Sequence, residues 1–414
     1  MAGPRRRVFV TGLGLVSPHG GVDAAAVFDR LYAGESAVRK VFSGSGESGN
    51  NVLMAAAEFD PAGVIPKAHL FTMDRVSQIA VVAAHRAMAA AGVLAGEHGP
   101  ADAGIYMGCG LGGAQAIQDA YAIYFLRRSR KVKPTSVPLV MPNAPAAHIS
   151  MRYRLLGPSY TYSVACASSA IAIGEAFRAV RDGYLERALA GGTEAMLNDG
   201  SVVAWESLGV LAKEHPDGPA ASSRPFALDR TGFVLGEGAA VLMLESEAAV
   251  DARGAQPIAE IVGFGAASDA HNLTQPTSGG QVRALRLALA DAAVEPAEIG
   301  YINAHATATM VGDKVEIDAV KEVFGAHARA LAISATKSMH GHLVGAAGAL
   351  EFAITVMALQ QRRLPPTANL TVPDPACDLD CVPVRGREAP GLECALSNSF
   401  AFGGSNAVLI ARRV

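Results

Sequence analysis

Cys166 stands where a predicted strand turns into a predicted helix. The apolar stretch Tyr160–Val164 is typical of a strand, and the alanine-rich stretch from about Ser168 to Asp182 predicts a helix with Gly183 as its stop. Near a helix N-terminus the macrodipole favours a thiolate, which is the nucleophilic form of cysteine. The chemistry suggested is nucleophilic catalysis, and the alternative is a small apolar core residue.

Two further loops place histidines just after predicted buried strands. One reads Asn303-Ala-His-Ala-Thr-Ala-Thr309, and the other reads Lys337-Ser-Met-His-Gly-His-Leu343 and leads into the small residues 345–348. A lone histidine in such a place usually has a structural role. Two such loops together with Cys166 predict one site, in which imidazoles handle protons or negative charge beside a nucleophilic thiol.

A glycine cluster follows the predicted strand 103–108 and reads Cys109-Gly-Leu-Gly-Gly113. Backbone N–H groups of such a loop can cradle a phosphate. The spacing is not the dinucleotide-binding fingerprint, and the acidic partner expected about 20 residues further on is not evident. A tight turn at which two backbones cross is therefore the favoured interpretation.

A run of basic residues follows the glycine cluster. A solvated surface is the usual meaning of such a run, and docking of an acidic partner is the functional alternative. The run consists of Arg127, Arg128, Arg130, Lys131 and Lys133.

The composition predicts a large buried core. Of 414 residues, 50% are hydrophobic and 18% are charged, and the net charge of -3 argues against a nucleic-acid partner. We expect no membrane span, because no stretch offers about 18 uninterrupted apolar residues. The odd number of cysteines and the lack of an evident secretory signal favour reduced thiols in the cytoplasm. Cys377 and Cys381 lack further ligands at convincing spacing, so no metal site is predicted.

Three pairs of segments recur in the same order and suggest a duplicated chain. Residues 7–14 resemble 259–265 in character, residues 104–110 resemble 300–306, and the Cys166 segment resembles 337–361. We therefore expect two similar halves, residues 1–255 and 256–414, whose pairing would bring the Cys166 and His342 segments to one central site. Alternating strands and helices predict an α/β fold with mostly parallel sheets.

These motifs resemble those of the β-ketoacyl-acyl-carrier-protein synthases, specifically the ketosynthases of the synthase I/II type in the thiolase-like superfamily. The resemblance begins at Phe9-Val-Thr-Gly12, includes Asp229-Arg-Thr-Gly-Phe-Val-Leu-Gly-Glu-Gly238 and extends to Asn398-Ser-Phe-Ala-Phe-Gly-Gly-Ser-Asn406. It covers nearly the whole chain. It implies five layers, αβαβα, built from two duplicated halves, and a dimer either of identical chains or with a second ketosynthase-like chain.

The implied reaction is a decarboxylative Claisen condensation that lengthens a fatty-acid, polyketide or polyene chain by two carbons. Cys166 would take the acyl group from an acyl carrier protein, and the enolate of malonyl carrier protein would then attack it. By the resemblance, His305 and His342 stabilise the enolate, and Lys337 supports the electrostatics, with Glu351 as its candidate partner. Which histidine acts in decarboxylation stays open. No metal or organic cofactor is implied, because the pantetheine arm belongs to the carrier protein.

The resemblance also assigns contacts to the substrate and to the carrier protein. The backbone N–H groups of Cys166 and Phe402 would form an oxyanion hole, and Phe402 would gate the malonyl site. Thr307 and Thr309 match residues that hydrogen-bond the pantetheine arm. Leu111 matches a position in the acyl pocket, with ordinary core packing as the alternative. The acidic carrier protein would dock on Arg127, Arg128, Arg130 and Lys131, with Lys67 as a further candidate.

Related proteins differ at identifiable residues. Thiolases use a second cysteine in the C-terminal glycine loop, which here reads Phe400-Ala-Phe-Gly-Gly404. Initiating synthases of the third type have an asparagine where this chain has His342, and non-catalytic chain-length partners lack the cysteine. Two alternatives stay open: a mainly structural, pocket-shaping subunit of a ketosynthase heterodimer, and a hydrolase or plain acyltransferase.

Ala401 departs from the family pattern, which has glycine before the gate phenylalanine. Alanine resists positive φ, so we expect a gating loop whose motion is restricted or altered.

Overall fold

Ten strands form a continuous sheet in two halves. The computed structural model describes residues 5–21, 23–44 and 49–414. The strand order is β11-β10-β14-β15-β9-β1-β8-β6-β4-β5. The strands of the first half are β1 (Val8–Val16), β4 (Gly104–Gly108), β5 (Ser159–Tyr162), β6 (Arg187–Glu194) and β8 (Gly238–Ser246). Those of the second half are β9 (Ala259–Ser268), β10 (Tyr301–Asn303), β11 (Ala332–Ser334), β14 (Cys394–Phe400) and β15 (Ser405–Arg412).

The two halves have the same topology, which confirms the duplication. In the first half, β4 runs parallel to β5 and β6, and β8 runs antiparallel to β6 and β1. In the second half, β10 likewise runs parallel to β11 and β14, and β15 runs antiparallel to β14 and β9. The start of β1 pairs with β9 and joins the halves. The three segment pairs seen in the sequence occupy equivalent places in this pattern.

The sheet is mixed, so the expectation of mostly parallel strands was wrong. The antiparallel pair β14 and β15 is joined by only four residues, 401–404. Parallel neighbours need a long crossover, and a loop of this length can join only antiparallel strands.

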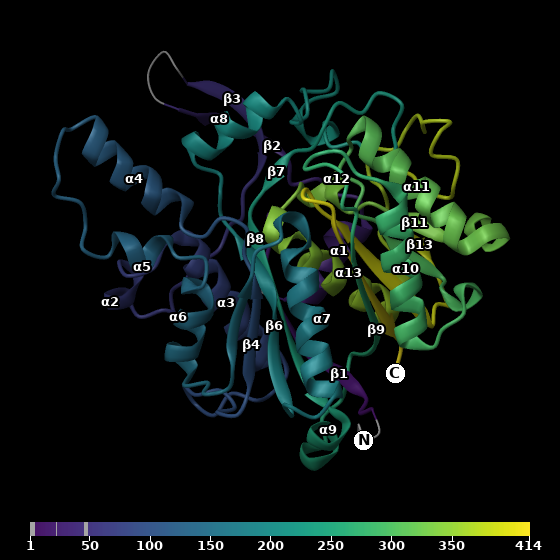
Figure 1. Ribbon diagram of the computed structural model, residues 1–414, viewed down its shortest axis with the longest axis horizontal. Coiled ribbons are helices and arrows are strands. Elements are labelled where there is room, and N and C mark those ends of the chain that lie inside the picture. Colours follow the sequence, from purple (N-terminus) through teal and green to yellow (C-terminus); the bar gives the residue numbers. More distant parts are fainter. Residues whose placement is uncertain (1–4, 22, 45–48) are drawn as a thin grey trace.

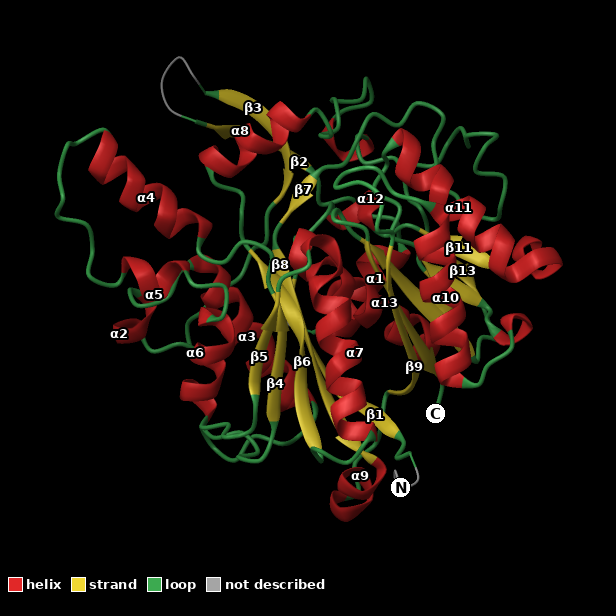
Figure 2. Ribbon diagram, in the orientation of Figure 1, coloured by secondary structure: helices red, strands yellow, loops and turns green. Residues whose placement is uncertain are grey.

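Helices cover both faces of each half-sheet and complete five layers (Figures 1 and 2). The central layer holds α7 (Ser168–Arg181) and α13 (Ala347–Gln361), which contact each other. The outer helices are α3 (Arg75–Ala90) and α6 (Ala144–Tyr153) on the first half, and α10 (Ser278–Ala292) and α11 (Met310–Phe324) on the second.

The central helix α13 is apolar on all sides because it lies between the two half-sheets. Every residue from Ala347 to Leu359 is buried. Among the described residues, the segment Val344–Gln361 is long and apolar enough to cross a membrane, but 89% of that window is buried inside the protein. Its hydrophobicity therefore fits a core helix.

The remaining helices and short strands complete the chain. Figure 1 shows α4 and α5 standing out at the left edge, joined by a long loop. These elements are α1 (Ala24–Tyr32), β2 (Arg39–Ser43), β3 (Asn50–Ala55), α2 (Lys67–Leu70), α4 (Ala114–Phe125), α5 (Ser136–Val140), α8 (Asp199–Leu208), β7 (Leu235–Gly236), α9 (Glu247–Arg253), α12 (Lys337–His340), β12 (Arg363–Leu364) and β13 (Arg387–Glu388).

Candidate active site

Cys166 lies in a single 3-10 turn, Ala165–Ala167, directly before α7. The predicted strand before it ends two residues early, at Tyr162. Ala165 adopts a left-handed conformation, with φ of 50°, which costs on the order of 1 kcal/mol or more for a residue other than glycine. The Ser168 hydroxyl supports the turn by accepting from the Val164 N–H (2.9 Å) and donating to the Ala165 carbonyl (2.6 Å).

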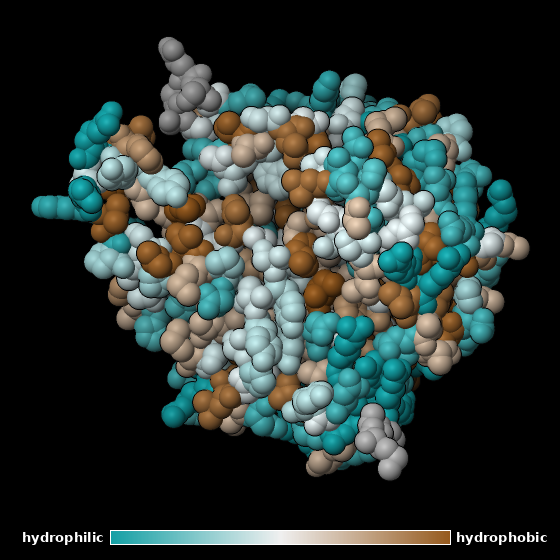
Figure 3. All heavy atoms as spheres, in the orientation of Figure 1, coloured by the Kyte–Doolittle hydropathy of each residue, from teal (hydrophilic) through white to brown (hydrophobic). Residues whose placement is uncertain are grey.

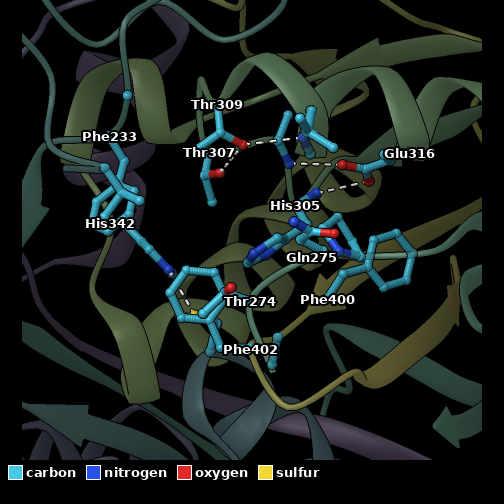
Figure 4. Close-up of a pocket in the computed structure, with 18 of the residues that line it drawn as sticks. Phe233, Thr274, Gln275, His305, Thr307, Thr309, Glu316, His342, Phe400 and Phe402 are labelled. Atoms are coloured by element: carbon cyan, nitrogen blue, oxygen red, sulfur yellow. Dashed lines mark hydrogen bonds between the residues drawn. The ribbon is translucent and has the colours of Figure 1, made fainter. Parts of the chain in front are cut away.

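The Cys166 thiol faces the imidazole of His342. Its Sγ lies 2.9 Å from Nε2 of His342, as the dashed line in Figure 4 shows. Burial raises the pKa of Cys166 to about 12, although Lys337 and the backbone N–H groups of Phe402 and Cys166 oppose this shift. The backbone N–H groups act in the direction expected of the helix end, but burial outweighs them and keeps the resting thiol protonated. The thiol needs His342 as its base.

His342 is neutral and well placed to accept that proton. Burial lowers its pKa well below the usual value, and the Lys337 cation and His340 lower it further. Phe233 packs edge-on against its ring, with centroids 5.3 Å apart.

Lys337 determines which nitrogen of His305 carries a hydrogen. The Lys337 ammonium is fully buried, forms an ion pair with Glu351, and lies 3.4 Å from Nδ1 of His305. An ammonium group can only donate, so Nδ1 accepts and the hydrogen of the neutral ring sits on Nε2. Burial and Lys337 also hold the pKa of His305 well below its usual value. His305 is therefore a hydrogen-bond donor that stays uncharged.

A buried carboxylate holds the loop that carries His305. Glu316 on α11 accepts from the backbone N–H groups of His305 (2.9 Å) and Ala306 (2.7 Å) and from the Asn398 amide (2.8 Å). Figure 4 shows the two backbone contacts to the right of the site. This carboxylate links the end of β10 to α11 and to β14, and it restricts where the His305 ring can point.

A cavity of about 630 Å³ brings most of the predicted residues together. Cys166, His305 and His342 all line it. Thr307 and Thr309 lie on one wall with their hydroxyl oxygens 3.3 Å apart, and Phe402 lines it close to Cys166. Of the predicted catalytic and substrate-binding residues, two line no part of this cavity: Lys337 is buried behind His305, and Leu111 is 50% exposed on the surface of the single chain.

The cluster of Cys166, His305 and His342 resembles a metal-ligand set, since its donor atoms lie within 4.8 Å of one another. A ligating imidazole must present an unprotonated nitrogen to the metal. The Lys337 contact keeps the hydrogen of His305 on Nε2, the nitrogen that faces the cavity. The geometry therefore suits a donor and a base better than a set of metal ligands.

The basic run lies on the surface loop between α4 and α5. Arg127, Arg128, Arg130 and Lys131 are exposed, and none pairs with an acidic residue in the part of the chain that the structure describes. Exposed apolar side chains lie close to the run in sequence, and Figure 3 shows brown atoms on this side of the molecule. They are Tyr121, Tyr124, Phe125, Leu126, Val132, Val137 and Met141.

Two residues of the site had no recognisable signal in their sequence spacing. Glu316 looks like an ordinary surface glutamate, and only the fold buries it. Trp205 lines the cavity and stacks on Phe402, with centroids 6.2 Å apart. As the only tryptophan of the chain, it was conspicuous in composition but lay outside every motif.

Comparison with known proteins gives the family. The model for "Beta-ketoacyl synthase, N-terminal domain" matches residues 5–249, and that for "Beta-ketoacyl synthase, C-terminal domain" matches residues 258–371. The chain is 42% identical to Nodulation protein E of Rhizobium sp. (strain N33), covering 99% of this chain and all of that protein. It is 37% identical to 3-oxoacyl-[acyl-carrier-protein] synthase 2 of Coxiella burnetii, with 99% of each chain covered.

Solved structures give the same result. The ishigamide ketosynthase/chain length factor superposes with a TM-score of 0.90 at 33% identity, covering 99% of this chain and all of that one. AntDE:AntF is a type II polyketide acyl-carrier protein in complex with its ketosynthase. One chain of this complex superposes on the present chain with a TM-score of 0.88 at 28% identity and the same coverage. This chain belongs to the β-ketoacyl synthase family and has the thiolase-like fold.

The family membership establishes the kind of reaction. The protein is a β-ketoacyl-acyl-carrier-protein synthase, an acyltransferase that extends an acyl chain by Claisen condensation. The complete set of Cys166, His305 and His342 around one cavity does not favour the alternative of a mainly structural subunit.

Proposed function

We propose that Cys166 and His342 load the acyl group and that His305 and Lys337 serve the condensation. The observation that carries this assignment is the different surroundings of the two histidines. His342 faces the thiol at 2.9 Å, whereas Lys337 fixes a hydrogen on the cavity side of His305.

The first half-reaction moves the acyl group from carrier protein to Cys166. The thiol proton passes to Nε2 of His342 as Sγ attacks the thioester carbonyl and the Sγ–C bond forms. The bond from carbon to the pantetheine sulfur then breaks, and the His342 imidazolium returns the proton to that sulfur. The backbone N–H groups of Cys166 and Phe402, which both point at the thiol, would stabilise the oxyanion, and each such donor is worth on the order of 10²-fold or more in rate.

The second half-reaction joins two carbons to the chain. Malonyl carrier protein loses CO₂, and the electron pair of the broken C–C bond forms an enolate. His305 donates its Nε2–H to the enolate oxygen, and Thr307 and Thr309 hydrogen-bond the pantetheine arm along the cavity wall. The enolate carbon attacks the acyl carbonyl, the Sγ–acyl bond breaks, and the Cys166 thiolate regains a proton from solvent.

The partners follow from the surface and from the relatives. We propose that the acidic carrier protein docks on Arg127, Arg128, Arg130 and Lys131, with Lys67 nearby on α2, because these cations are exposed and free of ion pairs with described residues. AntDE:AntF is a complex of a carrier protein with its ketosynthase. We further propose a cytoplasmic location, as for an enzyme of acyl-chain synthesis.

We also propose that the protein functions as a dimer. No strand among the described residues pairs with the outer edge of β5, and Leu111 is half exposed instead of closing an acyl pocket. A second ketosynthase-like chain, either identical or a chain length factor as in the ishigamide structure, would cover both.

The seam between the two halves near residue 255 stays a prediction.

The test is intact-mass spectrometry of the protein offered a panel of acyl carrier proteins and then malonyl carrier protein. We expect one acyl group on wild-type protein and none on Cys166→Ala, followed by release of a chain two carbons longer together with CO₂. Release of free acid without CO₂ would instead show a hydrolase. Product formed by Cys166→Ala would show that the chemistry belongs to another chain.

A further inference from the structure

Glu194 at the end of β6 is a buried carboxylate that the proposed mechanism does not use. Its exposure is 0%. Its carboxylate accepts hydrogen bonds from the backbone N–H groups of Gly110 (2.8 Å), Leu111 (3.3 Å) and Gly345 (3.1 Å). No cation pairs with it among the residues that the structure describes. Glu194 therefore binds two separate loops to each other through one charge.

The two loops are shaped to receive this carboxylate. A Cβ added at Gly110 would lie 2.4 Å from Oε2 of Glu194, and one added at Gly345 would lie 2.5 Å from the same atom. Real Cβ atoms do not approach so closely. At Gly345 the added Cβ would also lie 2.5 Å from the backbone nitrogen of Gly110, so this position requires glycine, whereas at Gly110 a methyl group would displace only the carboxylate. The glycine cluster 109–113 does hold an anion, but the anion is a side chain of the same protein and not a phosphate.

Each loop carries a residue of the proposed site. The first loop carries Leu111, the candidate wall of the acyl pocket. The second follows His342 by three residues, and its Val344 belongs to the same buried apolar cluster as Cys166. Val344 has φ of 45°, a conformation unfavourable for a β-branched residue, so this segment depends on its surroundings to keep its shape.

We propose that ionised Glu194 is a positioning residue that clamps the acyl-pocket loop against the segment after His342, and thereby sets which acyl chains Cys166 accepts. This inference rests on the proposed function and deepens it. Glu194 touches no substrate, so its effect must pass through Leu111 on one side and the His342 loop on the other.

Protonation would weaken the clamp, because a neutral carboxyl group is a poorer acceptor than a carboxylate and presents a hydrogen of its own. Burial raises the pKa of Glu194 to about 7, and only the three backbone N–H groups oppose that shift. The titratable group that faces Glu194 is the buried Cys109 thiol, whose pKa is itself raised by burial and by Glu194. The clamp is therefore complete above a pH of about 7 and loosens below it.

Stability and loading should respond to pH in opposite directions. Because the pKa of Glu194 in the folded chain lies above its ordinary value of 4.5, this group stabilises the fold most at low pH, and that contribution is lost as pH rises through about 7. Loading by the clamped form rises over the same range.

The experiment compares wild type with Glu194→Gln, which keeps the size of the side chain but places an amide N–H₂ toward backbone donors. Loading rates on Cys166 are measured for short, medium and long acyl carrier proteins from pH 5.5 to 8.5. We expect Glu194→Gln to change the ratio of long-chain to short-chain loading by about tenfold, the size expected for losing a charged hydrogen bond. We also expect it to flatten the fall in rate below pH 7. The exposed Glu97→Gln is the matched control.

Unchanged selectivity and an unchanged pH profile in folded Glu194→Gln would overturn the proposal. If that variant does not fold, Gly110→Ala pushes a methyl group at the same carboxylate from the loop side, and it must change selectivity in the same way. The two proposals fail separately. If wild type loads no acyl group, the proposed function is refuted. If wild type loads and elongates acyl chains, and Glu194→Gln has the same selectivity and pH profile as wild type, only the clamp is refuted.

Discussion

Two chemically similar histidines differ here because of one neighbouring side chain. Lys337 lies 3.4 Å from Nδ1 of His305 and makes its ion pair with Glu351. Burial raises the pKa of Glu351 to about 7 even beside that ammonium. Burying this ion pair away from water therefore costs free energy, and we infer that its role is to fix the tautomer of His305. The effect on the tautomer can be tested separately from the contribution of the pair to stability.

Lys337→Met tests that separation. The single variant leaves Glu351 buried without its cation, and we expect a loss of about 3–5 kcal/mol in the free energy of unfolding. The double variant Lys337→Met/Glu351→Gln should recover most of this stability. Both should condense more slowly, on the order of 10²-fold, because His305 is no longer held as an Nε2–H donor. Thermal melts and condensation rates measure the two effects. Wild-type condensation in the double variant would mean that Lys337 is only structural.

At the scale of elements, the turn between β14 and β15 carries Phe402, the proposed gate residue. The positive φ angles of this turn fall on Gly403 and Gly404, at 84° and 73°, and not on Ala401. Ala401 is instead held by hydrogen bonds to Ser405 (2.8 Å) and from Gly404 (3.0 Å). In this conformation alanine therefore causes no backbone strain. Any restriction that Ala401 places on the backbone would act when the turn moves Phe402 away from Cys166.

Trp205 provides a direct readout of that opening. Its ring stacks on Phe402, packs edge-on against Phe233 at 5.5 Å, and donates its N–H to the Met196 sulfur at 3.3 Å. Since it is the sole tryptophan, its emission should change when acylation of Cys166 displaces Phe402.

We expect Ala401→Gly to speed that change several-fold and to lower stability by roughly 0.5–1 kcal/mol, because glycine removes the barrier to positive φ but loses more entropy on folding. Stopped-flow fluorescence with an acyl carrier protein measures the rate, and Trp205→Phe supplies the blank. Equal rates for alanine and glycine would show that residue 401 is not the hinge.

At the scale of the whole molecule, the first half ends in a sheet edge with no strand partner among the described residues. β5 ends the sheet with a free edge, Tyr160 on it is 52% exposed, and Leu156 beside it is also exposed. Edge strands of this kind pair with another chain unless they are blocked. The aromatic face of α4 adds exposed apolar area on the same half.

Charge placed on this edge should separate the proposed dimer into monomers. We expect Leu156→Arg/Tyr160→Arg to sediment as a monomer and to lose acyl loading, since Leu111 would stay exposed. Leu287→Arg, on the outer helix α10 of the other half, should sediment as wild type. A double variant that keeps both its dimer and its loading would place the interface elsewhere.

The basic run makes a prediction about salt. If the carrier protein docks on Arg127, Arg128, Arg130 and Lys131 as proposed, ions will screen the attraction, with a Debye length of about 10 Å at 0.1 M ionic strength. KM for the carrier-protein substrate should therefore rise with salt while kcat stays constant. In Arg127→Ser/Arg128→Ser, KM should start high and respond less to salt. A KM that is insensitive to salt in wild type would remove this run from the interface.

The sequence alone determined the class of reaction and the candidate residues, because the cysteine and the two histidines lie in short motifs whose residue types are tied to local geometry. Cys166 before a helix, His305 after a strand and His342 in a glycine turn were all predictable. The duplication was also readable, since equivalent strands such as β1 and β9 retain similar residues.

Only the tertiary structure decided the electrostatics and the supports. Burial is a property of the assembled layers, so the sequence could not show that the Cys166 thiol stays protonated or that Lys337 selects a tautomer of His305. Glu194 and Glu316 meet their partners across 84 and 11 residues, respectively, of intervening chain. No local pattern marks such contacts, because the partners are backbone N–H groups that every residue but proline possesses.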